Sequence, residues 1–452
     1  IRLLNTWCST RIPAVFMETT AMWKDLSASW AVLLGIGFMM LANGLQGTLL
    51  GVRATIEGFS TFTTGIMMSG YFIGIFAGSF IAPYLVKRVG HIRVFSALAS
   101  LASISILFHG VYIDAWVWML MRIITGICFA GFYVVTESWL NDRASNETRG
   151  TVLSIYMLIV TFGMGSGQFL LNLARPEAID LFILISVIIS AGLIPMLLTA
   201  KPAPVFESSE KMSLLELFHA SPLAVIGNCL TGMAHGTIFG LGAIYASSVL
   251  VDIKLISWFM ACFLIGGVIL QWPVGYISDR VPRRLVMSIL SVLSIIASLL
   301  AVSVDKDSLN FYLIITVLGG AAMPMYSTCI AYANDRLEPH QIVAASGSLV
   351  MISGIGLCTG PIVIAFFMDF YSINFYFWGI AAVFAMILGF TMVRINSRIG
   401  IAVEDQAHLI AGPIGTPIAE YNAPDAIDYA EAIASDDIEI PEKDENKADK
   451  VW

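Results

Sequence analysis

Twelve long apolar runs, separated by short polar segments, dominate this chain between residues 29 and 395. One helical crossing of a bilayer core needs about 20 apolar residues, and each run has close to that length. Composition agrees, because 58% of the residues are hydrophobic and only 12% are charged, unlike a soluble globular protein. The runs lack the polar and apolar alternation of outer-membrane barrel strands. We therefore predict an all-α membrane protein with twelve transmembrane helices.

The two halves of the chain look like copies of each other. The phrase Asn-Asp-Arg follows an apolar run at Asn141 and again at Asn334, and an offset near 193 residues superposes most of the two halves. Tyr133, for example, falls on Tyr326. Parallel repeats of six spans predict two pseudo-symmetric six-helix bundles around an axis along the membrane normal, with a cavity between them near the midplane.

Polar segments divide the chain into five parts. We expect a cytoplasmic N-terminal segment (1–28), an N-terminal six-helix bundle (29–199), a cytoplasmic linker (200–221), a C-terminal six-helix bundle (222–396) and an acidic, disordered cytoplasmic tail (397–452). High charge and low hydrophobicity are typical of disorder. In the linker, Ser213 and Glu216 have the spacing of a capping box and predict a short interfacial helix.

The distribution of Lys and Arg predicts the orientation, because cytoplasmic loops carry the excess of these residues. With both termini in the cytoplasm, sixteen Lys and Arg fall in cytoplasmic segments and four in external ones. The basic residues are spread over loops and the C-terminus is acidic, so the sequence has no nucleic-acid footprint. We also expect the protein to be a monomer.

No pattern in the sequence predicts an enzyme, a metal site or a cofactor. The phosphate-binding pattern G-x-x-x-x-G-K-[ST] is absent, which argues against ATP-driven transport. The six cysteines form no C-x-x-C pair, and five of them lie in predicted helices as small buried side chains. Polar residues within the spans are too few for a hydrolytic site.

Several motifs in these runs resemble those of the major facilitator superfamily of secondary transporters, over about residues 29 to 395. Gly275-x-x-x-Asp279-Arg280-x-Pro282-Arg283-Arg284 is similar to the loop signature G-x-x-x-D-R-x-G-R-K, and Pro83-x-x-x-Lys87-Arg88-x-Gly90-His91 is a more divergent first-half copy. Arg122-x-x-x-Gly126-x-x-x-Ala130 is similar to the R-x-x-x-G motif of span four. Gly163-x-Gly165-x-Gly167 and Gly356-x-x-x-Gly360-Pro361 are similar to the glycine motif of the antiporters.

The resemblance has implications for location and mechanism. The stretch from Gly90-His91 to Thr148-Arg149-Gly150 resembles the YcaD-type bacterial branch, which implies the bacterial inner (plasma) membrane. Members of the superfamily work by alternating access, with spans one, four, seven and ten lining the cavity. Close helix packing explains the glycines of spans five and eleven better than nucleotide binding does.

Charged residues of the loop motifs predict a gate on the cytoplasmic side. We expect Asp279 to cap a helix end while Arg280 reaches a nearby carboxylate. The same gating motif includes Gly275, Arg283, Arg284, Arg88 and Gly90, although positive-inside topology explains Arg284 equally well. Glu137, near the cytoplasmic end of span four, is expected to pair with Arg88 or Arg143 in this network.

Arg122 is the most expensive residue to place in a membrane, since a charge at depth costs at least about 3 kcal/mol on insertion scales. It must therefore face the protein interior. Gly126, Phe129, Tyr133 and Glu137 share its helical stripe. One interpretation of Arg122 is an anchor for an anionic substrate group or a relay beside a proton site. The other is a structural tie to neighbouring helices.

Polar residues of spans one, four, seven and ten complete the set of candidates. His235 lies in the middle of span seven on a stripe with Asn228, and its imidazole is the best titratable candidate for ion coupling away from the loops. A hydrogen bond that only ties helices together is the alternative. For Asn43, Gln46, Tyr133 and Tyr326, hydrogen bonding to a substrate and bonding between helices are equally good interpretations.

These observations predict a secondary transporter that moves a small organic solute by alternating access, coupled to a proton or another ion gradient. Export of amphiphilic compounds is slightly favoured by Gly360-Pro361. Uptake of a small anionic metabolite is the alternative within this class. A membrane receptor or scaffold that binds a partner through the acidic tail is the alternative from another class.

Overall fold

The structure is a computed structural model, and it describes residues 2–143, 148–198, 212–397 and 406. These residues form thirteen α-helices, a short 3-10 helix (η1) and no strand. The helices of the first half are α1 (Arg2–Ile56), α2 (Thr61–Val89), α3 (His91–Val111), α4 (Ala115–Arg143), α5 (Arg149–Phe169) with η1 (Leu170–Leu173), and α6 (Asp180–Leu197). After α7 (Leu214–Ala220), the second half has α8 (Pro222–Val249), α9 (Ile253–Ser278), α10 (Arg283–Ser303), α11 (Leu309–Asn334), α12 (Pro339–Phe370) and α13 (Phe375–Ser397).

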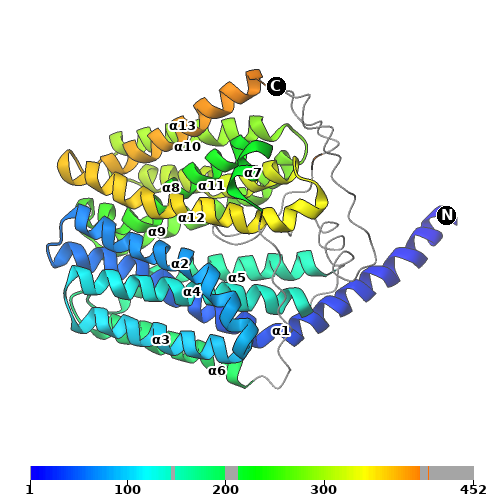
Figure 1. The fold of residues 1–452 in the computed structure, drawn as a ribbon, viewed down its shortest axis with the longest axis horizontal. Coiled ribbons are helices and arrows are strands. Elements are labelled where there is room, and N and C mark those ends of the chain that lie inside the picture. The colour runs from blue at the N-terminus through cyan, green and yellow to red at the C-terminus, as the bar shows by residue number, and fades with distance from the viewer. Residues whose placement is uncertain (1, 144–147, 199–211, 398–405, 407–452) are drawn as a thin grey trace.

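Twelve of these helices are long and apolar enough to cross a membrane, which confirms the predicted fold class. Helices are required there, because a lipid-exposed segment must satisfy its own backbone hydrogen bonds. Figure 1 shows α1 to α6 as one layer of helices and α8 to α13 as a second layer beside it. We call the end of the bundle where α2 ends and α3 begins the proximal end, and the opposite end, where α1 ends and α2 begins, the distal end.

Side-chain caps begin equivalent helices of the two halves at the distal end. Ser60 accepts a hydrogen bond from the backbone N–H of Thr63 at the start of α2, and Asp252 accepts one from Lys254 at the start of α9. Asp114 caps α4 and Ser308 caps α11 in the same way. These caps satisfy amides that a helix cannot pair internally. The repeat is therefore visible in the capping as well as in the order of the helices.

Glycines let particular helices approach closely within each half. A Cβ at Gly163 of α5 would lie 2.9 Å from the Cβ of Met40 on α1, and one at Gly360 of α12 would lie 2.8 Å from the Cα of Met233 on α8. The glycine motifs of spans five and eleven thus pack against spans one and seven, as expected from close helix packing.

The two halves meet at the distal end through repeat-equivalent residues. The hydroxyls of Thr55 on α1 and Ser247 on α8 are 2.9 Å apart, and the two residues are 192 positions apart in sequence. Gly51 and Ala243, separated by the same offset, are so close that a Cβ on the glycine would lie 2.8 Å from that of the alanine. A pair of residues related by the repeat can touch only near the pseudo-symmetry axis, so this axis passes between α1 and α8.

Further distal contacts lie on both sides of that axis. The backbone N–H of Thr61 donates to Asp369 of α12 over 3.2 Å, and the amide of Asn172 donates to the hydroxyl of Ser257 over 3.0 Å. Phe169 packs edge-on against Trp258 with ring centroids 4.9 Å apart. The hydrogen bonds of Thr55, Thr61 and Asn172 thus join the two halves at the distal end.

Two regions outside the twelve spans also bear on the predictions. α1 begins at Arg2, so its helix runs through the segment expected to precede the first span, and it projects beyond the bundle in Figure 1. α7 confirms the capping box, since the hydroxyl of Ser213 and the carboxylate of Glu216 both accept backbone hydrogen bonds at its start. The predicted acidic tail lies outside the described residues, apart from Ser397 and Gln406.

Candidate functional site

Arg122 lies two turns inside α4, about 10 Å from its distal start. Its exposed fraction is 3%, and its guanidinium carbon lies over the Tyr71 ring, 4.4 Å from the centroid. Within the described residues, no carboxylate forms an ion pair with this guanidinium, and its Nε and Nη1 atoms have no hydrogen-bond partner. Arg122 is therefore buried as expected, and among the described residues only the face of an aromatic ring offsets its charge.

Tyr71 on α2 organises the surroundings of Arg122. The amide nitrogen of Asn43 on α1 donates to the Tyr71 hydroxyl over 3.2 Å, so three helices meet at this ring. Phe129, one of the residues on the predicted stripe of α4, lies 6.0 Å from Tyr71 between ring centroids. The structure thus brings the candidates Asn43 and Arg122 together through a residue that the sequence did not single out.

Close packing of α2 against α4 allows this contact. A Cβ at Gly126 would collide with the backbone oxygen of Tyr71, and one at Gly70 would lie 2.9 Å from the backbone oxygen of Met119. The spacing of Gly70, Gly74 and Gly78 is a signal for such packing, and it identifies the face of α2 next to Tyr71. This spacing is the only sequence signal that points to Tyr71.

Gln46 lies one turn from Asn43 on the same face of α1. It is fully buried, and neither its amide nitrogen nor its amide oxygen has a hydrogen-bond partner among the described residues. Unpaired buried amides are unusual, because each lost hydrogen bond leaves a desolvated polar atom. Gln46 therefore has unmet binding capacity beside the Asn43–Tyr71 contact.

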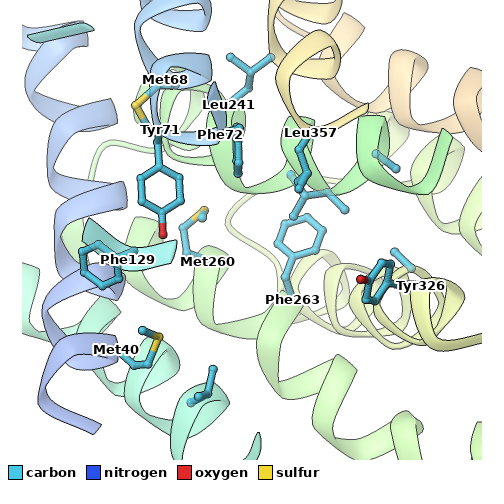
Figure 2. Close-up of a cluster of buried hydrophobic side chains, with 14 of the residues drawn as sticks. Met40, Met68, Tyr71, Phe72, Phe129, Leu241, Met260, Phe263, Tyr326 and Leu357 are labelled. Atoms are coloured by element: carbon cyan, nitrogen blue, oxygen red, sulfur yellow. The ribbon is translucent and has the colours of Figure 1, made fainter. Parts of the chain in front are cut away.

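Apolar side chains surround this polar group. Figure 2 shows Tyr71 between Met68 and Phe129, with Met260 of α9 nearby, so that residues of both halves contribute to the cluster. Met40, Phe72, Leu241, Phe263, Tyr326 and Leu357 are further members of the cluster. Methionine side chains adapt to ligands of varied shape.

The other residues of the α4 stripe contact other helices. The Tyr133 hydroxyl lies 3.4 Å from the sulfur of Met40 on α1. Glu137 is buried and accepts a hydrogen bond of 3.1 Å from Tyr156 on α5. Of the two partners expected for Glu137, Arg88 is exposed and contacts the Tyr84 hydroxyl instead. Glu137 thus links α4 to α5 at the proximal end.

His235 and Asn228 bind backbone carbonyls in the second half. The Nε2 atom of His235 lies 2.9 Å from the carbonyl oxygen of Ala322 on α11, and Asn228 donates to Leu349 of α12 over 2.7 Å. His235 is buried, and its Nδ1 atom has no partner within the described residues. Tyr326 is also fully buried, on α11. The geometry of Asn228 matches a helix tie, while His235 keeps one nitrogen available.

Arg283 is the central residue of the proximal loop motif. Its exposed fraction is 1%, and its Nε atom donates to Asp335 over 2.7 Å, while Nη1 lies 3.7 Å from Asp279. Arg280 is exposed, donates to the carbonyl of Tyr276 over 3.0 Å and stacks on that ring. The expectation that Arg280 reaches a carboxylate is therefore wrong, because its side chain points back along α9 and Arg283 takes that role.

The remaining motif residues have structural contacts. Asp279 is the C-cap of α9, and its backbone N–H donates to the carbonyl of Gly275 over 3.1 Å. Arg284 is buried and donates to the Tyr332 hydroxyl over 3.1 Å and to the carbonyl of Arg394 over 3.0 Å. Gly90 has a φ of 88°, which allows the tight turn between α2 and α3.

Comparison with known proteins agrees with the fold and its motifs. The Major Facilitator Superfamily matches residues 32–251 and 224–408. "Uncharacterized MFS-type transporter YcaD" of Escherichia coli O9:H4 (strain HS) is 28% identical over 355 residues, which span 78% of this chain and 92% of that protein. These matches confirm the resemblance inferred from the motifs.

Solved structures show the same architecture. The nucleoside transporter NupG superposes with a TM-score of 0.69 at 15% identity, covering 82% of this chain and 100% of NupG. A bacterial homolog of the human lysosomal transporter Spinster, in an inward-facing and occupied conformation, has a TM-score of 0.60 at 14% identity, covering 91% and 98% of the two chains. At these identities the likeness concerns the fold alone. Together with the family match, the twelve helices and the motifs establish that this chain is an integral membrane transporter of the major facilitator superfamily.

Proposed function

We propose that this transporter moves a small organic solute by alternating access, driven by a proton gradient, with export of amphiphilic compounds favoured over uptake. The observation that carries the proposal is the distal contact between the repeat-equivalent residues Thr55 and Ser247. A contact on a pseudo-symmetry axis can open and close when two similar halves rock against each other. In this proposal the protein is a monomer of the bacterial inner membrane with both termini in the cytoplasm, so the distal end is external.

The coupling and the direction of transport rest on different residues. His235 is the proposed proton carrier, because it is buried between α8 and α11 and one of its ring nitrogens is available among the described residues. Gly356 and Gly360, which resemble the antiporter motif, pack against α8 and support export. The isolated charge of Arg122 also suits uptake of an anionic metabolite, which is the alternative.

Proton flux tests the coupling. The protein is reconstituted into liposomes that contain a pH dye, a proton gradient is imposed, and pooled amphiphiles and carboxylates are screened for solute-dependent proton movement. We expect flux that is lost in Arg122→Ala and in His235→Ala. Flux that both folded variants retain would contradict the assigned roles. The side from which the solute must be added separates export from uptake.

A cross-link tests alternating access directly. Thr55→Cys and Ser247→Cys are combined in a background from which the six native cysteines have been removed. The two hydroxyls are 2.9 Å apart, so thiols at these positions can form a disulfide when the distal end is closed. Oxidation should abolish solute flux and reduction should restore it, while each single-cysteine variant stays active. An oxidised double variant with full flux would contradict rocking about this contact.

A further inference from the structure

We propose that the substrate is an amphipathic organic carboxylate whose acid group binds to Arg122 and Gln46 in the first half. This inference rests on the proposed transport function and specifies its substrate class. The apolar part of the substrate lies in the cluster that contains Met68, Tyr71, Phe129 and Met260 of α9.

Arg122 places a charge inside the bundle that no described carboxylate balances. Arg cannot lose its proton at ordinary pH, so its burial at 3% exposure leaves a permanent cation inside the bundle. Buried charges in proteins are normally paired. Among the described residues Arg122 has only the Tyr71 ring, and a ring is a weaker partner than an anion. The missing negative charge is therefore expected on a ligand.

Arg53 shows how this chain treats an arginine with a structural role. Arg53 on α1 is also largely buried, yet it forms an ion pair of 2.6 Å with Glu57 and donates to the carbonyl of Pro176 over 3.0 Å. Arg283 likewise has Asp335. Arg122 differs from both, because the part of the chain that the structure describes provides it with no carboxylate.

Arg122 and Gln46 both have buried polar atoms that could bind a carboxylate. Two of the three guanidinium nitrogens of Arg122 and both polar atoms of the Gln46 side chain are buried without a partner among the described residues. A carboxylate has two acceptor oxygens, so it can accept hydrogen bonds from the guanidinium and from the Gln46 amide nitrogen. The hydrogen bond from Asn43 fixes the Tyr71 ring against the guanidinium of Arg122.

The second half has no equivalent of the Arg122 and Asn43 pair. The residue equivalent to Arg122 in the second half is Ile315, which is fully buried and apolar. The residue equivalent to Asn43 is His235, whose Nε2 atom is already paired with a carbonyl. A site with one charged end and soft apolar walls of methionine and aromatic residues favours a ligand with one charged end and a hydrocarbon body.

Binding to the full-length protein in lipid nanodiscs tests the inference independently of transport. The probes are octanoate, octanamide and octylamine, which share a hydrocarbon chain and differ in the charge of the head group. We expect octanoate to bind at least about 10-fold more tightly than the other two, since only it pairs with the cation. Arg122→Met should weaken octanoate binding by at least about 30-fold, the lower range for loss of a buried charge partner.

Variants separate binding from structural support. Arg122→Met should unfold at the same temperature as the wild type or at a higher one in the absence of ligand, because it removes an uncompensated buried charge. Arg53→Met is the matched control and should leave octanoate affinity unchanged. Gln46→Leu should weaken octanoate binding by at least about 10-fold without affecting octanamide, the lower range for loss of one hydrogen bond to a charged group.

Each outcome decides for or against the carboxylate site. Equal affinity for octanoate and octanamide, or octanoate binding that survives both Arg122→Met and Gln46→Leu, would overturn it. If Arg122→Met does not fold, Arg122 has a structural role and the inference also fails, unless Gln46→Leu folds and selectively loses octanoate. Flux of amines or neutral solutes without carboxylate binding would leave the transporter function intact and overturn this inference. Octanoate binding with no flux of any solute would support this inference and contradict the proposed transport function.

Discussion

The proximal turns of the two halves have the same position in the repeat but different chemistry. In the second half, Arg283 is buried and bound to Asp335 over 2.7 Å. In the first half, the equivalent residue is His91, and its ring nitrogen lies 3.0 Å from the hydroxyl of Ser138. Asp142, the equivalent of Asp335, is exposed and lies 3.7 Å from its neighbour Arg143. The repeat thus preserves the architecture, while the buried ion pair is found at the second-half turn.

The turn backbones differ as well. Gly90 has a φ of 88° between α2 and α3, whereas Pro282 at the equivalent position has a φ of −55° before α10. A proline cannot adopt a positive φ, so the two loops must follow different paths. A repeated motif therefore does not have one role, because Arg283 is buried with Asp335 in the second half, whereas His91 occupies the position of Arg283 in the first half.

The largest effect is expected from breaking the buried ion pair. Asp335→Asn leaves Arg283 in the interior with one carboxylate less, and we expect a loss of about 3–5 kcal/mol in unfolding free energy. Asp142→Asn is the matched first-half change and should cost less than about 1 kcal/mol, since that carboxylate is exposed. Unfolding in mixed micelles measures both. Equal losses would mean that the two turns are energetically alike.

A second prediction concerns a place where the halves agree. A Cβ at Gly126 would collide with the backbone of Tyr71, and one at Gly319 would collide with the backbone of Phe263. Gly126→Ala and Gly319→Ala should each cost about 1–3 kcal/mol of unfolding free energy, because backbone cannot move aside easily.

Gly389→Ala in α13 is the control for that pair. Nothing lies within 4 Å of a Cβ there, and alanine favours helix, so stability should stay the same or rise. The same micelle assay applies. A loss at only one of Gly126 and Gly319 would show that the close packing of the repeat is not symmetric in energy.

The turn glycine should give a smaller effect. Gly90→Ala places a side chain at a φ of 88°, and we expect a loss of about 1–2 kcal/mol from backbone strain. Pro282→Ala should cost less than about 1 kcal/mol, because its φ of −55° suits alanine. Thermal unfolding of the two variants beside the wild type measures the difference. A larger loss for Pro282→Ala would contradict the described turn geometry.

The smallest effect is expected at the exposed cations. Arg88 and Arg280 are repeat equivalents, both are exposed, and each contacts the tyrosine four residues earlier in the chain. Arg88→Ala and Arg280→Ala should therefore change the unfolding free energy by less than about 0.5 kcal/mol. If Arg280→Ala instead caused a loss as large as that of Asp335→Asn, Arg280 would have the role that we assign to Arg283.

Much of the fold could be predicted from the sequence, because the bilayer restricts the solutions. Apolar runs of sufficient length must be helices, and a repeat in the chain implies a repeat in space. The burial of Arg122 followed from the cost of its charge, and the glycine motifs followed from close packing. Ser213 and Glu216 predicted a helix start because both cap contacts are local.

The contacts between helices could not be predicted in the same way. Arg280 and Arg283 are equally charged and only three residues apart, so the sequence does not show which of them turns inward. Tyr71 carries no charge and resembles the other aromatic residues in its run. Its role depends on how closely α2 approaches α4 and on the position of Asn43 on α1.

The sequence by itself determined the number of spans, their helical state, the duplication and the need to bury Arg122. These follow from hydrophobicity, length and charge, which are properties of each segment alone. Only the tertiary structure decided that Arg122 faces Tyr71, that Arg283 binds Asp335, and that Thr55 meets Ser247 at the axis. Each of these pairs joins residues from different helices, and such contacts depend on the packing of several helices at once.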